Sequence, residues 1–161
     1  MATDRYADAN VEAGNRATAL AQAGADIKKF CNTTEKTAAD NDTSVIRLLK
    51  GVPVSAVIGE LSISNDALSG ATDVDIGFYK TDGGAVLDKD ILTDGDDINA
   101  GGVVDGLQTV DRANKAKTIA ELYLAVAGSA IGVETVDICI TGNTIGTASG
   151  TITCFGELWV Q

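Results

Sequence analysis

The residues with the most chemical potential lie in one short stretch, DVDIGFYKTDGGAVLDKDIL (residues 73–92), which holds five aspartates. Carboxylates at this density can coordinate calcium. A pair of them at a suitable separation can also hydrolyse a glycosidic bond. The third interpretation is a β-hairpin with an acidic outer face, because the aspartates alternate with apolar residues. The rest of the sequence discriminates among these three.

The strongest calcium pattern is DKDILTDGDDIN (residues 88–99). An EF-hand loop needs oxygen ligands at positions 1, 3 and 5, glycine at position 6 and glutamate at position 12. Counted from Asp90, position 5 is Asp94 and position 6 is Gly95, but position 3 is Leu92 and position 12 is Gly101. Because two ligands fail, we interpret the segment as an acidic solvated loop and expect no cofactor. The weaker alternative is a calcium site of another kind, with carboxylates from Asp88, Asp90, Asp94 and Asp96.

Enzymatic chemistry is disfavoured because the chain contains no histidine. This removes Ser-His-Asp and Cys-His catalysis, imidazole zinc sites and the commonest general base. The three cysteines lack the paired spacing of a metal site or a disulfide framework, and we expect Cys139 and Cys154 to be buried free thiols. Sugar-cleaving clefts usually need aromatic platforms, and the chain has one Trp, three Tyr and three Phe. We therefore predict no enzymatic activity.

Composition and net charge restrict the classes of partner that the protein can bind. With 23 acidic against 12 basic residues the net charge is −11, so the surface repels phosphate backbones and we expect no nucleic-acid binding. The start MATDRYADANVEAG lacks the apolar region of a signal peptide, and no window is long enough for a membrane span. The sequence thus predicts a protein that is made and kept in a cytoplasm.

The elements that must position the aspartates are strands. In DVDIGFYK (residues 73–80), Val74, Ile76 and Phe78 point one way and the aspartates the other, and TDGG turns the chain into AVLDKDIL. Seven or so such strands, separated by glycine-rich turns, predict an all-β domain over residues 43–161, either a β-sandwich or a jelly roll. A short helix is expected within DRANKAKTIAELYLAVAG (residues 111–128), where apolar residues fall at helical spacing.

Residues 1–42 differ from the rest of the chain. They are rich in Ala, Asp, Asn and Thr and hold too few large apolar side chains to fold as a unit. Either a disordered leader or an arm that becomes ordered on a neighbouring subunit would have this composition. We favour an extended or partly helical arm, whose anchors would be Leu20, Ile27 and Phe30.

Several of these segments also resemble a known group of proteins. The parts that carry the likeness are IRLLKGVPVSAVI, ALSGATDVDIGFYKTDGGAVLDKD, the DG at residues 94–95 and KAKTIAELYLA. In this order, over residues 43–126, they resemble capsid-associated structural proteins of tailed bacteriophages, of the decoration (cement) kind. These are packing and turn motifs rather than catalytic signatures.

The resemblance implies a β-sandwich or jelly-roll protein on the outside of an icosahedral head, hence a virion location. It implies the major capsid protein as partner, assembly as a homotrimer, and use of the N-terminal arm in contacts. Arg47 and Lys50, beside the first strand of the domain, could then pair with acids of a neighbour. Two alternatives stay open: a receptor- or glycan-binding module with a site lined by Tyr79, Tyr123 or Trp159, and a tail or fibre component of the virion.

Overall fold

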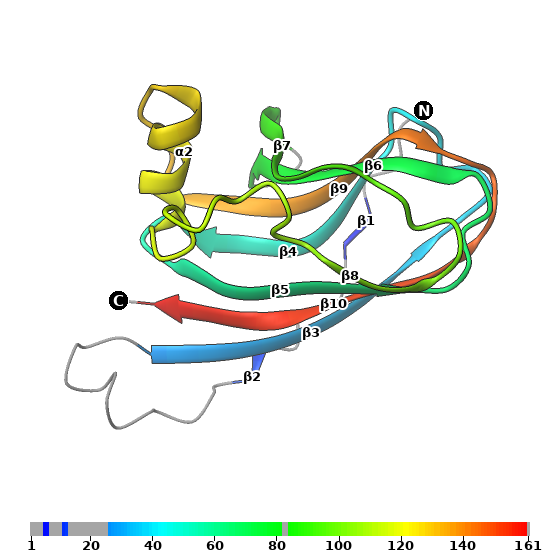
Figure 1. The fold of residues 1–161 in the computed structure, drawn as a ribbon, viewed down its shortest axis with the longest axis horizontal. Coiled ribbons are helices and arrows are strands. Elements are labelled where there is room, and N and C mark those ends of the chain that lie inside the picture. The colour runs from blue at the N-terminus through cyan, green and yellow to red at the C-terminus, as the bar shows by residue number, and fades with distance from the viewer. Residues whose placement is uncertain (1–4, 7–10, 13–25, 82–83, 161) are drawn as a thin grey trace.

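The computed structural model describes residues 5–6, 11–12, 26–81 and 84–160. These residues form ten strands and one helix (Figure 1). In chain order the elements are β1 (Arg5–Tyr6), β2 (Val11–Glu12), β3 (Asp26–Lys36), β4 (Val45–Pro53), β5 (Val57–Asn65), β6 (Ala71–Lys80), β7 (Val86–Asp96), β8 (Gly102–Asp105), α2 (Ile119–Ala127), β9 (Thr135–Ile145) and β10 (Gly150–Val160).

The strands form two facing sheets, with the orders β1-β4-β9-β6-β7 (sheet A) and β2-β3-β10-β5-β8 (sheet B). Without the two-residue strands β1 and β2, eight antiparallel strands are left, four in each sheet. Numbered one to eight along the chain, their orders are 2-7-4-5 and 1-8-3-6, which is the arrangement of a jelly roll. The pairs β3·β10, β4·β9, β5·β8 and β6·β7 make the chain one long hairpin that is rolled up. The predicted all-β sandwich is confirmed.

Strand alternation fills the space between the sheets with apolar side chains. On β6 and β9, Ile76 lies opposite Ile140 and Phe78 opposite Ile138. All four are at most 1% exposed. Each buried side chain of this size contributes about 1.5–3 kcal/mol relative to an exposed one, so these layers are the main source of stability.

The sandwich begins earlier than residue 43, the boundary that the composition predicts. Strand β3 pairs with β10 over eleven residues, from Lys36 opposite Gly150 to Asp26 opposite Val160. From Asp26 onward the expected arm is therefore the first strand of the jelly roll. Of the preceding residues, the structure describes β1, which runs parallel to β4, and β2, which pairs with β3. The other residues of the predicted arm, Leu20 among them, lie outside the described part of the chain.

Strand β3 does not resemble a core strand in sequence, because three of its four buried side chains, Asn32, Thr34 and Lys36, are polar. Asn32 is 2% exposed and donates from Nδ2 to the carbonyl of Leu48 at 3.0 Å. Lys36 is fully buried and donates from Nζ to the carbonyls of Gly146, at 3.0 Å, and Ala148, at 2.8 Å. Burial lowers the pKa of Lys36, and the nearby carboxylates oppose this effect. Backbone carbonyls thus accept the hydrogen bonds of buried polar side chains that the sequence pattern assigns to solvent.

The predicted short helix is confirmed as α2, in the connection between β8 and β9. It begins at a capping box: Thr118 receives the backbone N–H of Glu121 on its hydroxyl and donates its own N–H to the Glu121 carboxylate. It ends at Gly128, whose φ of 70° suits glycine. Backbone bonds from Ile119 and Ala120 to the β4–β5 connection fix the helix to one end of the sandwich (Figure 1). We call this end the α2 end.

The predicted hairpin is confirmed as β6 and β7, but its register is irregular. Phe78 lies opposite Asp88 and Ile76 opposite Thr93, so two steps along β6 match five steps along β7. The extra residues of β7 bulge across Gly77, where a Cβ atom would lie 2.1 Å from the carbonyl oxygen of Asp88. The bulge therefore requires glycine at position 77.

Gly77→Ala is expected to lower the free energy of unfolding by about 1–3 kcal/mol, because the β7 bulge must move to admit the methyl group. Urea unfolding of the full chain measures this. Thr72→Ala, at an exposed position of the same strand, is the control, with a change within about 0.5 kcal/mol. Equal stability of the two variants would contradict the close approach at Gly77.

Candidate interaction site

Of the three apolar residues proposed as anchors, the structure describes Ile27 and Phe30. Phe30 is 4% exposed and belongs to the core, so it packs within the chain rather than against a neighbour. Ile27 is half-buried near the start of β3. Leu20 lies outside the described residues. The described part of the predicted arm therefore contributes to the domain itself.

The two basic residues expected to pair with acidic groups of a neighbour, Arg47 and Lys50, lie in different environments. Arg47 is 3% exposed and donates from Nη1 to the Asp137 carboxylate, which is fully buried, at 2.5 Å. The other oxygen of that carboxylate accepts the backbone N–H of Gly51 at 2.8 Å. Arg47 thus pairs inside the chain, which corrects the expectation of an intermolecular partner. Lys50 is exposed on β4.

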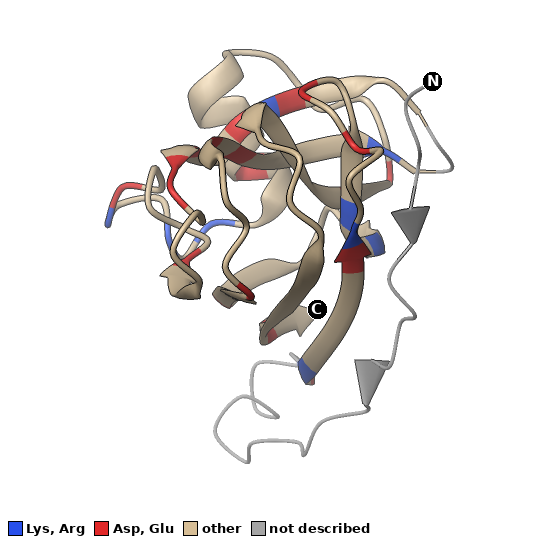
Figure 2. Ribbon diagram, turned by 90° about the vertical axis from the view of Figure 1, so that its right-hand side faces the viewer, with Lys and Arg blue, Asp and Glu red and all other residues tan. Residues whose placement is uncertain are grey.

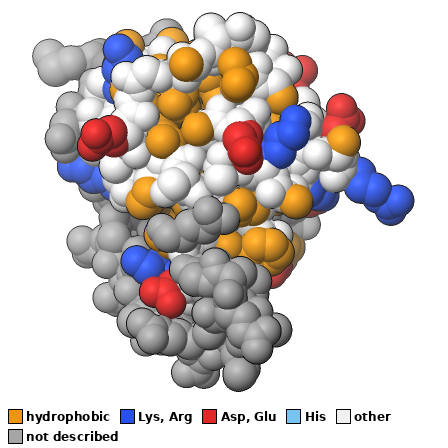
Figure 3. All heavy atoms as spheres, turned by 90° about the vertical axis from the view of Figure 1, so that its left-hand side faces the viewer, with side chains coloured by type: hydrophobic (Ala, Val, Ile, Leu, Met, Phe, Trp, Pro, Cys, Tyr) orange, Lys and Arg blue, Asp and Glu red, His pale blue; other side chains and the backbone are white. Residues whose placement is uncertain are grey.

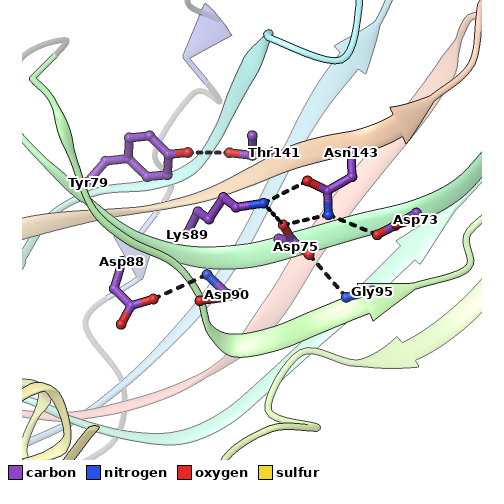
Figure 4. A network of polar contacts seen from close by, with 9 residues as sticks. All are labelled: Asp73, Asp75, Tyr79, Asp88, Lys89, Asp90, Gly95, Thr141 and Asn143. Carbon is purple, nitrogen blue, oxygen red and sulfur yellow. Dashed lines mark hydrogen bonds and ion pairs between the residues drawn. The ribbon is translucent and has the colours of Figure 1, made fainter. Parts of the chain in front are cut away.

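The aspartate-rich stretch forms a polar network on the outer side of sheet A (Figure 4). Asp75 of β6 is fully buried, and its Oδ2 accepts from Lys89 Nζ at 2.6 Å and from Asn143 Nδ2 at 2.9 Å. Its Oδ1 accepts the backbone N–H of Gly95 at 3.1 Å. The predicted solvent-facing role of this aspartate is wrong, because Lys89 on the β7 bulge covers and neutralises it.

The groups of this network hold strands together. Lys89 comes from β7, Asp75 from β6 and Asn143 from β9, and Lys89 also donates to Asn143 Oδ1 at 2.6 Å. The ion pair with Asp75 raises the pKa of Lys89, so the amine stays protonated and is a poor nucleophile or base. Both oxygens of Asp75 accept hydrogen bonds from the protein. The network thus ties three neighbouring strands of sheet A to one another.

Beside this network, Asp88 and Asp90 form an acidic pair on the β7 bulge (Figure 4). Partial burial, together with the adjoining Asp90 carboxyl, raises the pKa of Asp88 to about 6. Among the described residues, no three His, Cys, Asp or Glu side chains are close enough together to hold one metal ion. Asp94 and Asp96, the other members of the weaker calcium alternative, belong to no such group.

None of the three aromatic residues that would line a glycan site is exposed. Tyr79 is 5% exposed and hydrogen-bonds Thr141 on the outer side of sheet A (Figure 4). Tyr123 is half-buried on α2. Trp159 belongs to sheet B, where its indole ring lies over Gly59, which leaves no room for a Cβ there. The Tyr123 hydroxyl donates to the carbonyl of Leu87, whose neighbour Val86 lies opposite Tyr79, whereas Trp159 lies on the other sheet.

Charged side chains are dispersed over the described surface. In Figure 2, Asp and Glu are spread over strands and loops, with Lys and Arg among them.

No helix in the described ranges is long and apolar enough to cross a membrane. Cys139 and Cys154 are buried and form no disulfide, and burial raises the pKa of Cys154 to about 12. These two thiols agree with the sequence prediction, whereas Cys31 is exposed.

A pocket of about 200 Å³ opens at the α2 end. Three elements line it: the bulged part of β7, the segment that precedes α2, and α2 itself. Asp90, Asp94 and Asp111 contribute carboxylates, while Val110, Leu122 and Val126 contribute apolar surface. Hydrophobic side chains gather on the upper part of this end of the molecule (Figure 3). Sequence reasoning missed the pocket, because three distant segments form it.

The raised pKa of Asp88 predicts a pH-dependent stability. Its value of about 6 in the folded state exceeds the unfolded value of about 3.9, so this group reduces stability as the pH rises from 4 to 6. Asp88→Asn removes this effect. At pH 7 the variant is expected to be more stable than the wild type by about 1 kcal/mol, a value reduced for the partial solvent exposure of the carboxyl.

Thermal unfolding of both proteins from pH 4 to pH 7 measures this difference, which should vanish by pH 4. Asp94→Asn, which removes an exposed carboxylate of the same strand, controls for the change in net charge. A stability difference between Asp88→Asn and the wild type that does not change with pH would contradict the assignment.

Comparison with known proteins supports the architecture. No protein-family model matches the chain, and no curated protein matches it. Among solved structures, a chain of the cyanophage Pam1 capsid asymmetric unit is similar, with a TM-score of 0.51 and 13% sequence identity. The similarity covers 96% of this chain and 95% of that chain. At this identity the likeness concerns the fold, which extends over nearly the whole of both chains.

Proposed function

We propose that this chain is a non-enzymatic structural protein of a tailed-phage virion, and specifically a decoration protein that binds the outside of the head. Its partner would be the major capsid protein, and the chain would assemble as a homotrimer on the capsid surface. The observation that carries the proposal is the match in fold, over nearly the full length of both chains, to a chain of a phage capsid asymmetric unit. The sequence resemblance over residues 43–126 points the same way.

The geometry fits a protein that acts by binding. The chain has no histidine, and Asp75, the buried acid of the network, holds β6 to β7 and β9 through Lys89 and Asn143. The two sheets pack around one continuous core, so the sandwich presents a rigid body to a partner. Each copy would need to bury only a standard interface of about 1,600 Å² in total. Repetition over a symmetric shell would then multiply the effect through avidity.

The alternative of a receptor- or glycan-binding module has less support. Such a site is expected to display exposed aromatic side chains, and Tyr79 is buried while Tyr123 and Trp159 are half-buried. A tail or fibre component of the same fold is distinguished by where in the virion the protein binds. The test must therefore use heads and tails separately.

The proposal predicts that the purified full chain sediments with phage heads assembled without it, and not with isolated tails. Bound chain should also raise the temperature at which the heads release DNA, because a ligand that binds only the intact shell stabilises that shell. A dye that reports released DNA measures this temperature. An acidic protein of similar size serves as the control for nonspecific sedimentation.

A chain that stays in the supernatant with heads would contradict the proposal. Sedimentation with tails alone would replace it with a tail role. Native mass spectrometry of the full chain tests the trimer separately.

A further inference from the structure

The α2 end carries apolar surface that a solitary domain does not need. Leu124 and Val126 are 52% and 54% exposed, although they lie on a helix whose inner side, with Ile119 and Leu122, is already buried. A surface helix normally presents polar side chains outward. Single exposed apolar residues need no explanation, but Val126 also lines the pocket at this end. Val126 lies on the same side of α2 as Leu122 and extends the apolar wall of the pocket to the surface, whereas Leu124, two residues away, faces another side.

The pocket carries negative charge at its wall. Asp90, Asp94 and Asp111 line it, and no lysine or arginine does. These carboxylates belong to no group close enough to share one metal ion within the described residues. They are therefore placed for a longer cationic group that can meet several carboxylates. A guanidinium or an ammonium on an apolar stem has this shape, because the stem can pack on apolar surface while the head meets acids.

The size of the pocket agrees with such an occupant. Its volume is about 200 Å³, whereas one water molecule needs only about 10–15 Å³ of such space. Val110 and Leu122, which are 6% and 5% exposed, provide an apolar wall for the stem. A side chain of arginine or lysine, offered by a protein surface, would fill the pocket in this way.

A second copy of the chain is a poorer occupant than a different protein. The occupant must supply a cationic side chain, and a chain with 23 acidic against 12 basic residues offers fewer of these than a partner with a basic surface. At this end of the molecule, Lys115 lies 4.0 Å from Asp105 of its own chain. Charge complementarity therefore favours a partner that presents basic residues.

We propose that the α2 end is the docking surface for the capsid partner, which inserts a lysine or arginine side chain into the pocket while apolar residues next to it cover Val126. This inference rests on the proposed function, because the capsid protein is taken as the partner. It adds the surface that binds and the chemistry that is recognised.

The test compares two matched pairs of variants for binding to phage heads assembled without the chain. Asp94→Asn/Asp111→Asn removes two pocket carboxylates, and Glu35→Gln/Glu60→Gln removes two exposed carboxylates of sheet B. Val126→Ser removes apolar surface at the pocket, and Val103→Ser does so on β8, where that valine is 64% exposed. Thermal unfolding of each variant first confirms that it folds.

The pocket variants are expected to bind heads about tenfold or more weakly than the wild type, and the control variants within about twofold. The affinity of the wild type should also fall more steeply with salt than that of Asp94→Asn/Asp111→Asn. Equal binding by all variants would overturn this inference and leave the proposed function standing. Failure of the wild type to bind heads would instead overturn the proposed function, and this inference with it.

A second copy as the occupant would give a different result. The chain would self-associate in sedimentation without heads, and Asp94→Asn/Asp111→Asn would reduce that association while leaving binding to heads unchanged. This outcome would overturn the assignment of a basic capsid partner.

Discussion

The pairing of β3 with β10 is the constraint on which the rest of the structure depends. It joins residues 26–36 to residues 150–160, which lie at opposite ends of the described chain. On the outer side of the pair, Thr33 meets Thr153 at 3.0 Å and Glu35 accepts from Thr151 at 2.9 Å. Without this pairing β10 would lose one of its two neighbours, and the hairpin would not close into a jelly roll. Contacts between such distant segments are slow to form, so we expect closure to be a late step in folding.

The two faces of sheet A show how charge is accommodated near the core. Apolar side chains fill the inner face, whereas the outer face buries Asp75 and the Arg47–Asp137 pair. A buried charge is tolerated when a partner and hydrogen bonds accompany it, and each of these groups has both. The bulge of β7 over Gly77 brings Lys89 to Asp75 and forms part of the pocket wall. The same irregularity thus shapes the strand pairing, the network and the proposed docking surface.

Much of the fold could be predicted from local pattern. Alternation in residues 73–80 and the turn after them gave β6 and β7, and helical spacing gave α2, whose capping residues Thr118 and Glu121 stand three apart. Strand β3 could not be recognised, because Asn32 and Lys36 point inward and are satisfied by carbonyls distant in sequence. The burial of Asp75 depends on Lys89, fourteen residues away, and that of Arg47 on Asp137, ninety residues away. Such pairings are properties of the folded chain and leave no local signal.

The pocket was beyond prediction for the same reason, because Asp90, Asp111 and Val126 come together only through the connection between β8 and β9. The interaction surface that we propose is the α2 end, where acidic and apolar side chains adjoin, rather than the N-terminal segment that the sequence indicates. A jelly roll that binds through one end of the sandwich leaves both sheets free to act as a rigid support.

The central claim, that this domain binds the outside of a phage head, is tested most directly by electron cryomicroscopy of heads reconstituted with the full chain. In the reconstruction we expect density for the jelly roll at symmetry-related positions on the outer surface, with the α2 end against the capsid protein. Heads that carry no added density would contradict it, as would density on the inner surface of the shell.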